Sequence, residues 1–235
     1  GWLIPPALAG GWREHPSHLS ARRLSLASIG AEQLTSESIL AKLWRNPWLP
    51  PAVLLLLALG LRIYRLSSSP LWLDEIYGYL LGERGLAALL QNSLRDPHPP
   101  LYYLFQWAAS GFGSFHNEWA WRWPSVLFSS LAVPLVYWNA NRVTNRLNAF
   151  LGALLLAIAP AYLFFSQEAR AFAFTVFLAA LSALLIGRIR QKPHEKGGWI
   201  GLALLTALGL YSSYSYGLIA FVQVIYLAAI FPRHR

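Results

Sequence analysis

The sequence predicts an all-α integral membrane protein, a polytopic bundle of about seven helices with an interfacial outer loop. Hydrophobic residues make up 56% of the 235 residues and charged residues only 12%, about half the charged fraction of an ordinary soluble domain. The apolar residues come in long blocks separated by short polar stretches, rather than in amphipathic stripes. Cysteine is absent, which excludes a disulfide framework and a thiolate metal site.

The chain is predicted to have two regions. Residues 1–46 mix apolar and polar groups, and we interpret them as a cytoplasmic or interfacial arm. Residues 47–235 form the transmembrane module, and its polar segment 67–98 is the predicted outer loop. The first apolar block ends at Arg62 and Arg65, whose long side chains are placed to snorkel toward the membrane surface.

The predicted membrane helices correspond to the apolar blocks. These blocks are residues 47–66, 99–114, 122–140, 147–165, 168–187, 198–215 and 217–231. Simple alternation across the membrane would place the basic loop 187–198 outside, against the positive-inside rule. One block therefore does not cross fully, and we suspect 99–114, which is short and begins with two prolines.

The distribution of charge predicts the orientation in an inner or plasma membrane. The arm is rich in arginine and lysine, which places it inside, so the acidic loop 67–98 is predicted to be extracytoplasmic. The net charge of +9 could also suggest nucleic acid as a partner. The basic residues stand in short loops between apolar blocks, where they set orientation, so we expect membrane lipids and no nucleic acid as partners.

Two adjacent acids, Asp74 and Glu75 in "LWLDEIYGY", are the first candidate catalytic residues. Aromatic and branched neighbours make their flank amphipathic, which favours a position at the membrane boundary. A carboxylate in such a low-dielectric place can serve as a general base or bind a cation. The alternative is a solvated pair in an ordinary loop.

The segment "DPHPPLYYLF" places His98 at the entrance of the next apolar block. The two prolines fix the backbone there. His98 together with Glu75 would supply nitrogen and oxygen ligands of the kind that bind Zn, Mn or Mg, so a divalent metal is a candidate cofactor. The alternative is an interfacial histidine with no metal.

Charged residues interrupt apolar sequence at two further points. Glu168 and Arg170 stand in "FFSQEARAFAF", and Arg122 stands in "WAWRWPSVLF". Charge inside a bilayer is costly, so such residues usually face a cavity or one another. An arginine suits a phosphate oxygen. The alternatives are a loop that separates two helices for the first pair and a snorkelling anchor for Arg122.

These motifs, in the order "LWLDE", "HPPLYYLF", "RWPS" and "SQEAR" followed by a tyrosine cluster, resemble the GT-C glycosyltransferases of the family 39 kind. That family includes protein O-mannosyltransferases and lipid A aminoarabinose transferases. The resemblance runs from about residue 48 to 231. Complete members usually continue with more helices and often a soluble outer domain, so it implies a truncated front module.

The resemblance implies a transferase that moves a hexose or pentose from a polyprenyl-phosphate donor to an acceptor hydroxyl on the extracytoplasmic face. It makes Asp74 the best candidate base, with Glu75 beside it, and places His98 where relatives have a possible metal ligand. Arg122 and Arg170, with Glu168 beside them, become candidates for binding the lipid phosphate. A base and a cationic partner for the leaving group are what inverting glycosyl transfer needs.

The sequence also departs from the family. Relatives commonly have proline after the arginine of the "EAR" motif, where this chain has Ala171, and many have histidine where "LYSSYSYG" places Ser213. These departures favour an alternative function, a catalytically degenerate module that serves as a structural subunit of a larger membrane complex. A third alternative is a transporter that uses the same charges as a substrate path.

Overall fold

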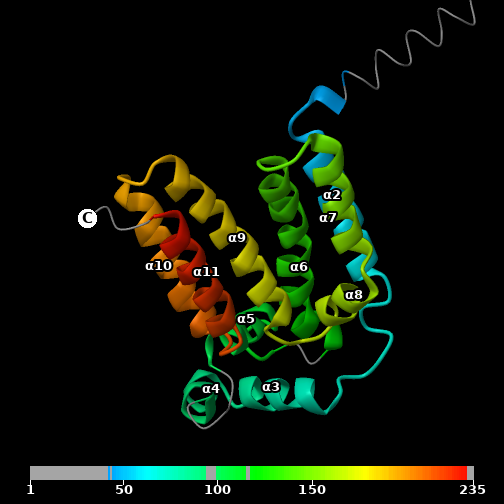
Figure 1. Ribbon diagram of the computed structural model, residues 1–235. Coiled ribbons are helices and arrows are strands. Elements are labelled where there is room, and N and C mark those ends of the chain that lie inside the picture. Colours follow the sequence, from blue (N-terminus) through cyan, green and yellow to red (C-terminus); the bar gives the residue numbers. More distant parts are fainter. Residues whose placement is uncertain (1–41, 43, 94–98, 115–116, 232–235) are drawn as a thin grey trace, which may run out of the picture. The chain divides into compact units, whose positions relative to one another are not determined.

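The computed structural model describes residues 42, 44–93, 99–114 and 117–231 (Figure 1). The chain divides after Pro47 into two units, and the helices below belong to the second, residues 48–235. Over its described residues this unit is helical and has no strand, which confirms the predicted all-α membrane bundle. The helices are α2 (Leu49–Ile63), α3 (Leu73–Glu83), α4 (Leu86–Ser93), α5 (Leu101–Ala109), α6 (Glu118–Asn141), α7 (Arg146–Ile158), α8 (Pro160–Ser166), α9 (Phe172–Gln191), α10 (Lys196–Leu210) and α11 (Tyr216–Ile230).

The lengths of the helices separate those that can cross a bilayer from those that cannot. In the described residues, α9 alone is long and apolar enough by itself, and α7 with α8 qualifies only if the pair, bent by 58° at its break, is one span. Helices α2, α10 and α11 are shorter but apolar. Helix α5 has 9 residues, or roughly 14 Å, so the block 99–114 is too short a helix to cross, as suspected from the sequence.

Helix α6 lies at the centre of the bundle, in contact with α2, α5, α7, α8 and α9. On one side of it, Ala149, Ala153 and Ala157 of α7 are fully buried against α2 and α6. Small residues spaced four apart lie on one face of a helix and let two backbones approach closely. This spacing explains how α7 packs tightly without large side chains.

The other side of the bundle is built from aromatic residues. Tyr102 of α5, Phe174 of α9 and Tyr216 of α11 are buried in one cluster. A Cβ on Gly209 of α10 would lie 2.4 Å from the Tyr216 ring, so only glycine allows α10 to lie against this tyrosine. The cluster therefore joins the last two helices to the core.

The predicted outer loop 67–98 forms helices α3 and α4, which lie across one end of the upright helices (Figure 1). Helix α3 begins at Leu73, and the backbone N–H of Trp72 just before it donates to the Glu75 carboxylate at 3.3 Å. Near the other end of α3, a Cβ on Gly82 would lie 2.3 Å from the buried ring of Trp121. Helix α3 is thus fixed against α6, and its first turn faces the bundle.

Arg62 does not snorkel, which corrects the sequence expectation, whereas Arg65 is exposed. The Arg62 side chain is fully buried in α2, where it donates to the Ser129 hydroxyl at 2.9 Å and to the Ala58 carbonyl at 3.1 Å. The guanidinium also lies over the ring of Tyr162, with 5.1 Å to the centroid. These neighbours from α6 and α8 provide the polar contacts that the membrane surface would otherwise supply.

Candidate functional site

The two adjacent acids of α3 have different surroundings. Glu75 is 1% exposed and faces α6, whereas the Asp74 side chain is 56% exposed at the rim of the site. Neighbouring residues in a helix point about 100° apart, so one acid can face the bundle while the other faces outward. The pair predicted from sequence is therefore divided between a buried position and an accessible one.

Glu75 forms a buried ion pair with Arg122 of α6. Oε1 of Glu75 accepts from Nε of Arg122 at 3.0 Å and from the backbone N–H of Ala169 at 2.7 Å. Oε2 accepts from Nη2 of Arg122 at 2.7 Å and from the backbone N–H of Trp72 at 3.3 Å. These contacts occupy the four acceptor positions of a carboxylate.

Arg122 also uses all of its donors inside the protein. Nη1 donates to the carbonyls of Leu66 at 2.8 Å and Ser69 at 3.0 Å, and Nη2 donates to Pro70 at 3.1 Å. Together with the two bonds to Glu75, every N–H of the guanidinium has an acceptor. The side chain is 5% exposed. It therefore fixes the connection between α2 and α3 from inside the protein.

The backbone of the "SQEAR" segment between α8 and α9 is held by buried polar side chains. Gln106 of α5 donates to the carbonyl of Ala169 at 2.7 Å. Ser125 of α6 donates to the carbonyl of Glu168, and its hydroxyl also pairs with that of Tyr102. Together with the bond from Ala169 to Glu75, these contacts leave this segment little freedom to move.

Sequence reasoning did not select Gln106, Ser125 or Gln167. Gln167 donates to the carbonyls of Arg62 at 3.0 Å and Tyr64 at 2.9 Å, which ties the same segment to the end of α2. Ser125 and Gln167 stand inside the motifs "RWPS" and "SQEAR", and Gln106 is a polar residue in an apolar block. A polar side chain in apolar sequence was the available signal.

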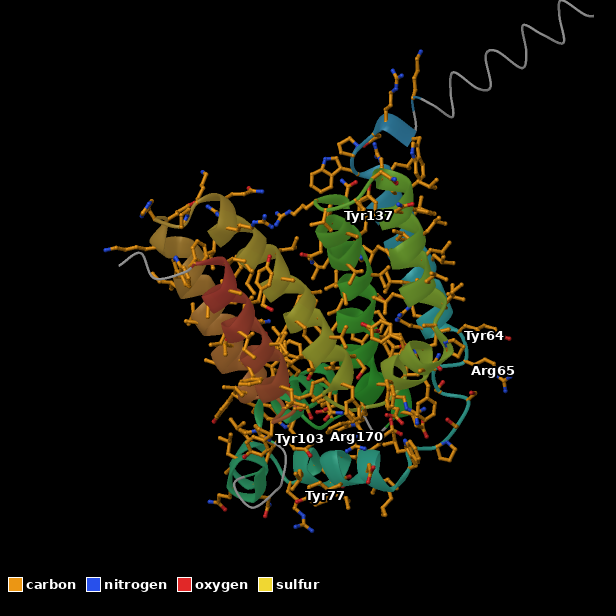
Figure 2. The ribbon with its side chains drawn as sticks, in the orientation of Figure 1. Tyr64, Arg65, Tyr77, Tyr103, Tyr137 and Arg170 are labelled. Atoms are coloured by element: carbon orange, nitrogen blue, oxygen red, sulfur yellow. The ribbon has the colours of Figure 1, made fainter. Side chains whose placement is uncertain are left out.

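Arg170 and Asp74 form the accessible part of the site. Nη1 of Arg170 lies 2.7 Å from Oδ2 of Asp74, and the Arg170 side chain is 26% exposed. The guanidinium lies over the ring of Phe172, with 5.1 Å to the centroid. Its other N–H groups have no acceptor among the described residues. Figure 2 shows Arg170 at the α3 end of the bundle, with Tyr137 near the opposite end.

Glu168 lines a cavity of about 400 Å³ beside the ion pair, together with Ser68, Ser69, Trp72 and Gln167. The residue is 5% exposed, and its carboxyl group has no hydrogen-bond donor within the described part of the chain. Burial raises the pKa of Glu168, and the negative charges of Glu75 and Asp74 raise it further against the opposing effect of Arg170 and Arg122. Glu168 is therefore harder to ionise than an ordinary glutamate.

The predicted metal does not fit Glu75 in this arrangement, because all four acceptor positions of that carboxylate are occupied. His98, the other predicted ligand, lies outside the described residues. Over residues 42, 44–93, 99–114 and 117–231, no group of three or more His, Asp or Glu side chains could hold a metal ion. A divalent metal stays a prediction, and no chemistry below depends on it.

The structure thus brings Asp74, Glu75, Arg122, Glu168 and Arg170 together at one end of the bundle. Residues 97–235, more than half of the chain, match the family described as dolichyl-phosphate-mannose-protein mannosyltransferase. The matched range includes Arg122, Glu168 and Arg170 and begins after α3. No curated protein sequence matches the chain.

Proposed function

Because the chain belongs to the dolichyl-phosphate-mannose-protein mannosyltransferase family and is a membrane glycosyltransferase of the GT-C type, we propose that it moves a sugar from a polyprenyl-phosphate donor to an acceptor hydroxyl. The reaction takes place at the α3 end of the bundle, which is the extracytoplasmic face. Membrane lipids surround the protein.

The orientation is supported by the charges at the two ends of the upright helices. The α6–α7 and α9–α10 connections, with the helix ends next to them, carry Arg142, Arg146, Arg188, Arg190 and Lys192. Positive connections of this kind stay in the cytoplasm. The α3 end of α9 lies 20 residues away, about 30 Å along the helix and close to the thickness of the hydrocarbon core. The helices therefore make a multi-pass bundle with α3 outside.

The observation that carries the proposal is the accessible pair of Asp74 and Arg170, with Oδ2 2.7 Å from Nη1. Asp74 is the base that accepts the proton of the acceptor hydroxyl. The acceptor oxygen attacks the anomeric carbon, and the bond from that carbon to the phosphate oxygen breaks. Arg170 stabilises the charge of the departing polyprenyl phosphate with its remaining N–H groups.

The accessible pair of Asp74 and Arg170 has three further charged neighbours with two different roles. Glu75 and Arg122 bind each other and the backbone around them, so they act as positioning residues rather than as phosphate ligands. Glu168 lines the adjacent cavity, and burial raises its pKa; in its protonated form it can donate a hydrogen bond to a phosphate or sugar oxygen. The proposed phosphate contacts are therefore Arg170 and Glu168.

The test is donor cleavage by the purified chain in lipid vesicles, with water as the acceptor in place of the alcohol, so that the sugar is released as the free sugar. Polyprenyl-phosphate mannose is the probe, chosen from the description of the family, and released polyprenyl phosphate is measured. We expect D74N to lower the rate at least 100-fold and R170Q to lower it by a similar factor. E83Q, at the end of α3, is the matched control for D74N, and R84Q, at the next position, is the control for R170Q. Both control positions are exposed.

Full release by a folded D74N variant would contradict the proposed base. If the unmodified chain releases nothing from this or other polyprenyl-phosphate sugars and copurifies with membrane partners in fixed ratio, the structural-subunit alternative replaces the proposal. This comparison is needed because the family resemblance leads us to expect histidine at position 213 and proline at position 171, where this chain has Ser213 and Ala171.

A further inference from the structure

A second polar cavity, of about 650 Å³, lies between α6, α9 and α11, at the ends of α6 and α9 remote from Asp74. Its polar lining consists of Asn139, Arg142, Arg190, Gln191, Gln223 and Tyr226. Two of these side chains are cations, and no acid of the described residues lines the cavity. The cavity therefore holds unbalanced positive charge.

The guanidinium of Arg142 is built into one wall. Its Nη1 donates to the carbonyl of Leu184 on α9 at 2.9 Å. A Cβ on Gly187 would lie 2.7 Å from the same nitrogen, so glycine at this position makes room for the guanidinium. The bond to Leu184 uses one donor and orients the group, while the other N–H groups have no acceptor in the described part of the chain.

Arg190 has no hydrogen bond or ion pair with any described residue, in contrast to a neighbour on the same helix. Arg188, two positions earlier, lies 2.5 Å from Oε1 of Glu195 and is neutralised by it. Arg188 does not line the cavity. The two arginines in the cavity thus lack the carboxylate partner that the arginine outside it has.

The surroundings favour a lipid as the source of the missing anion. Val222 and Tyr226 of α11 line the same cavity and are 63% and 42% exposed, on an apolar helix of a membrane protein. An acyl chain could follow that surface while a phosphate lies between the guanidinium groups, which match phosphate oxygens in charge and geometry. Basic pockets between membrane helices on the cytoplasmic side bind the headgroups of anionic lipids.

We infer that this cavity binds the phosphate headgroup of an anionic membrane lipid between Arg142 and Arg190. It is distinct from the site at Asp74, because Arg142 follows Arg122 by 20 positions along α6, or about 30 Å. Its assignment to the cytoplasmic face rests on the proposed orientation. The chemistry of the cavity does not depend on that orientation or on the proposed reaction.

The first test compares lipids that differ in headgroup charge. The purified chain is titrated with dioleoylphosphatidylglycerol or dioleoylphosphatidylcholine, and bound lipid is counted by native mass spectrometry. We expect tighter binding of the anionic lipid, and a loss of about fivefold for R142Q and for R190Q. R188Q removes the same charge outside the cavity and should change nothing. G187A, which displaces the Arg142 guanidinium without removing charge, should weaken binding as well.

A second measurement needs no variant and remains valid if one fails to fold. Phenylglyoxal modifies accessible arginines, and peptide mapping reads Arg142, Arg190 and Arg188 separately. We expect phosphatidylglycerol to protect the first two and not Arg188. Equal protection by glycerol phosphate alone would support the phosphate site and assign it a soluble ligand. Equal binding of both lipids, equal loss in R188Q, or no protection would overturn the inference.

Discussion

Glu75 and Arg122, 47 positions apart in the sequence, form a buried ion pair in which Oε2 lies 2.7 Å from Nη2. The arginine also binds three carbonyls of the α2–α3 connection, and the glutamate accepts from the backbone of Ala169. The pair thus joins α3, α6 and the segment before α9. Asp74, on the same helical turn as Glu75, is held toward Arg170 by this arrangement.

We predict that E75Q destabilises the protein far more than D74N. Removing the charge of Glu75 leaves the guanidinium of Arg122 buried without its anion, which costs about 3–5 kcal/mol. Asp74 is half exposed, so losing its charge should change stability by less than about 1 kcal/mol. Thermal unfolding in detergent measures both. Equal melting temperatures for the two variants would show that the buried pair contributes no more than the exposed one.

A second prediction concerns the packing of α3. G82A places a Cβ 2.3 Å from the Trp121 ring, and such overpacking costs about 1–3 kcal/mol. G60A is the matched control, because a Cβ on Gly60 in α2 meets nothing within 4 Å. Alanine there should leave stability unchanged or raise it slightly, since it favours the helix. If both variants melt alike, α3 does not depend on close contact with Trp121.

The sequence was sufficient for the fold class and for the place of the charged motifs, because apolar block length and intramembrane charge are local signals. The sequence could not show that Glu75 forms an ion pair with Arg122 and Asp74 with Arg170. Both pairs depend on how helices distant in the sequence pack together. The burial of Arg62 was missed for the same reason: Ser129 of α6 and Tyr162 of α8 accommodate it only in the folded bundle.

Ser125 holds the "SQEAR" segment, so we predict that its removal lowers the rate of the proposed reaction much more than it lowers the melting temperature. S125A removes the donor to the carbonyl of Glu168 and the partner of the Tyr102 hydroxyl. Arg170 then loses its fixed position, and the proposed donor cleavage should fall about tenfold or more. Rates and melting temperatures are measured on the same samples. A merely structural role of Ser125 would lower the melting temperature and leave the rate of the folded protein unchanged.

Ser130 provides the control for this variant. It is buried on the same helix, but its hydroxyl has no hydrogen-bond partner in the described residues. S130A should therefore leave the rate unchanged and stability unchanged or higher. A similar loss of rate in both variants would mean that any serine deletion in α6 disturbs the site, and that Ser125 has no special part in placing Arg170.

The buried carboxyl group of Glu168 predicts a pH dependence of stability. Its pKa is raised above the ordinary value of 4.5, first by burial and then by the charge of Glu75. Below pH 4.5 the group is protonated in both the folded and the unfolded protein, and its favourable contribution is complete. As pH rises through the raised pKa, the folded protein must ionise a buried group, so this contribution is lost.

E168Q stays neutral at every pH and serves as the reference. The melting temperature of E168Q relative to the unmodified chain should therefore increase between pH 4.5 and pH 8. E83Q, at an exposed acid of α3, should show no such trend. A difference between E168Q and the unmodified chain that stays constant over this range would mean that Glu168 ionises in the fold as easily as in water, and it would remove the basis for its role as a hydrogen-bond donor to phosphate.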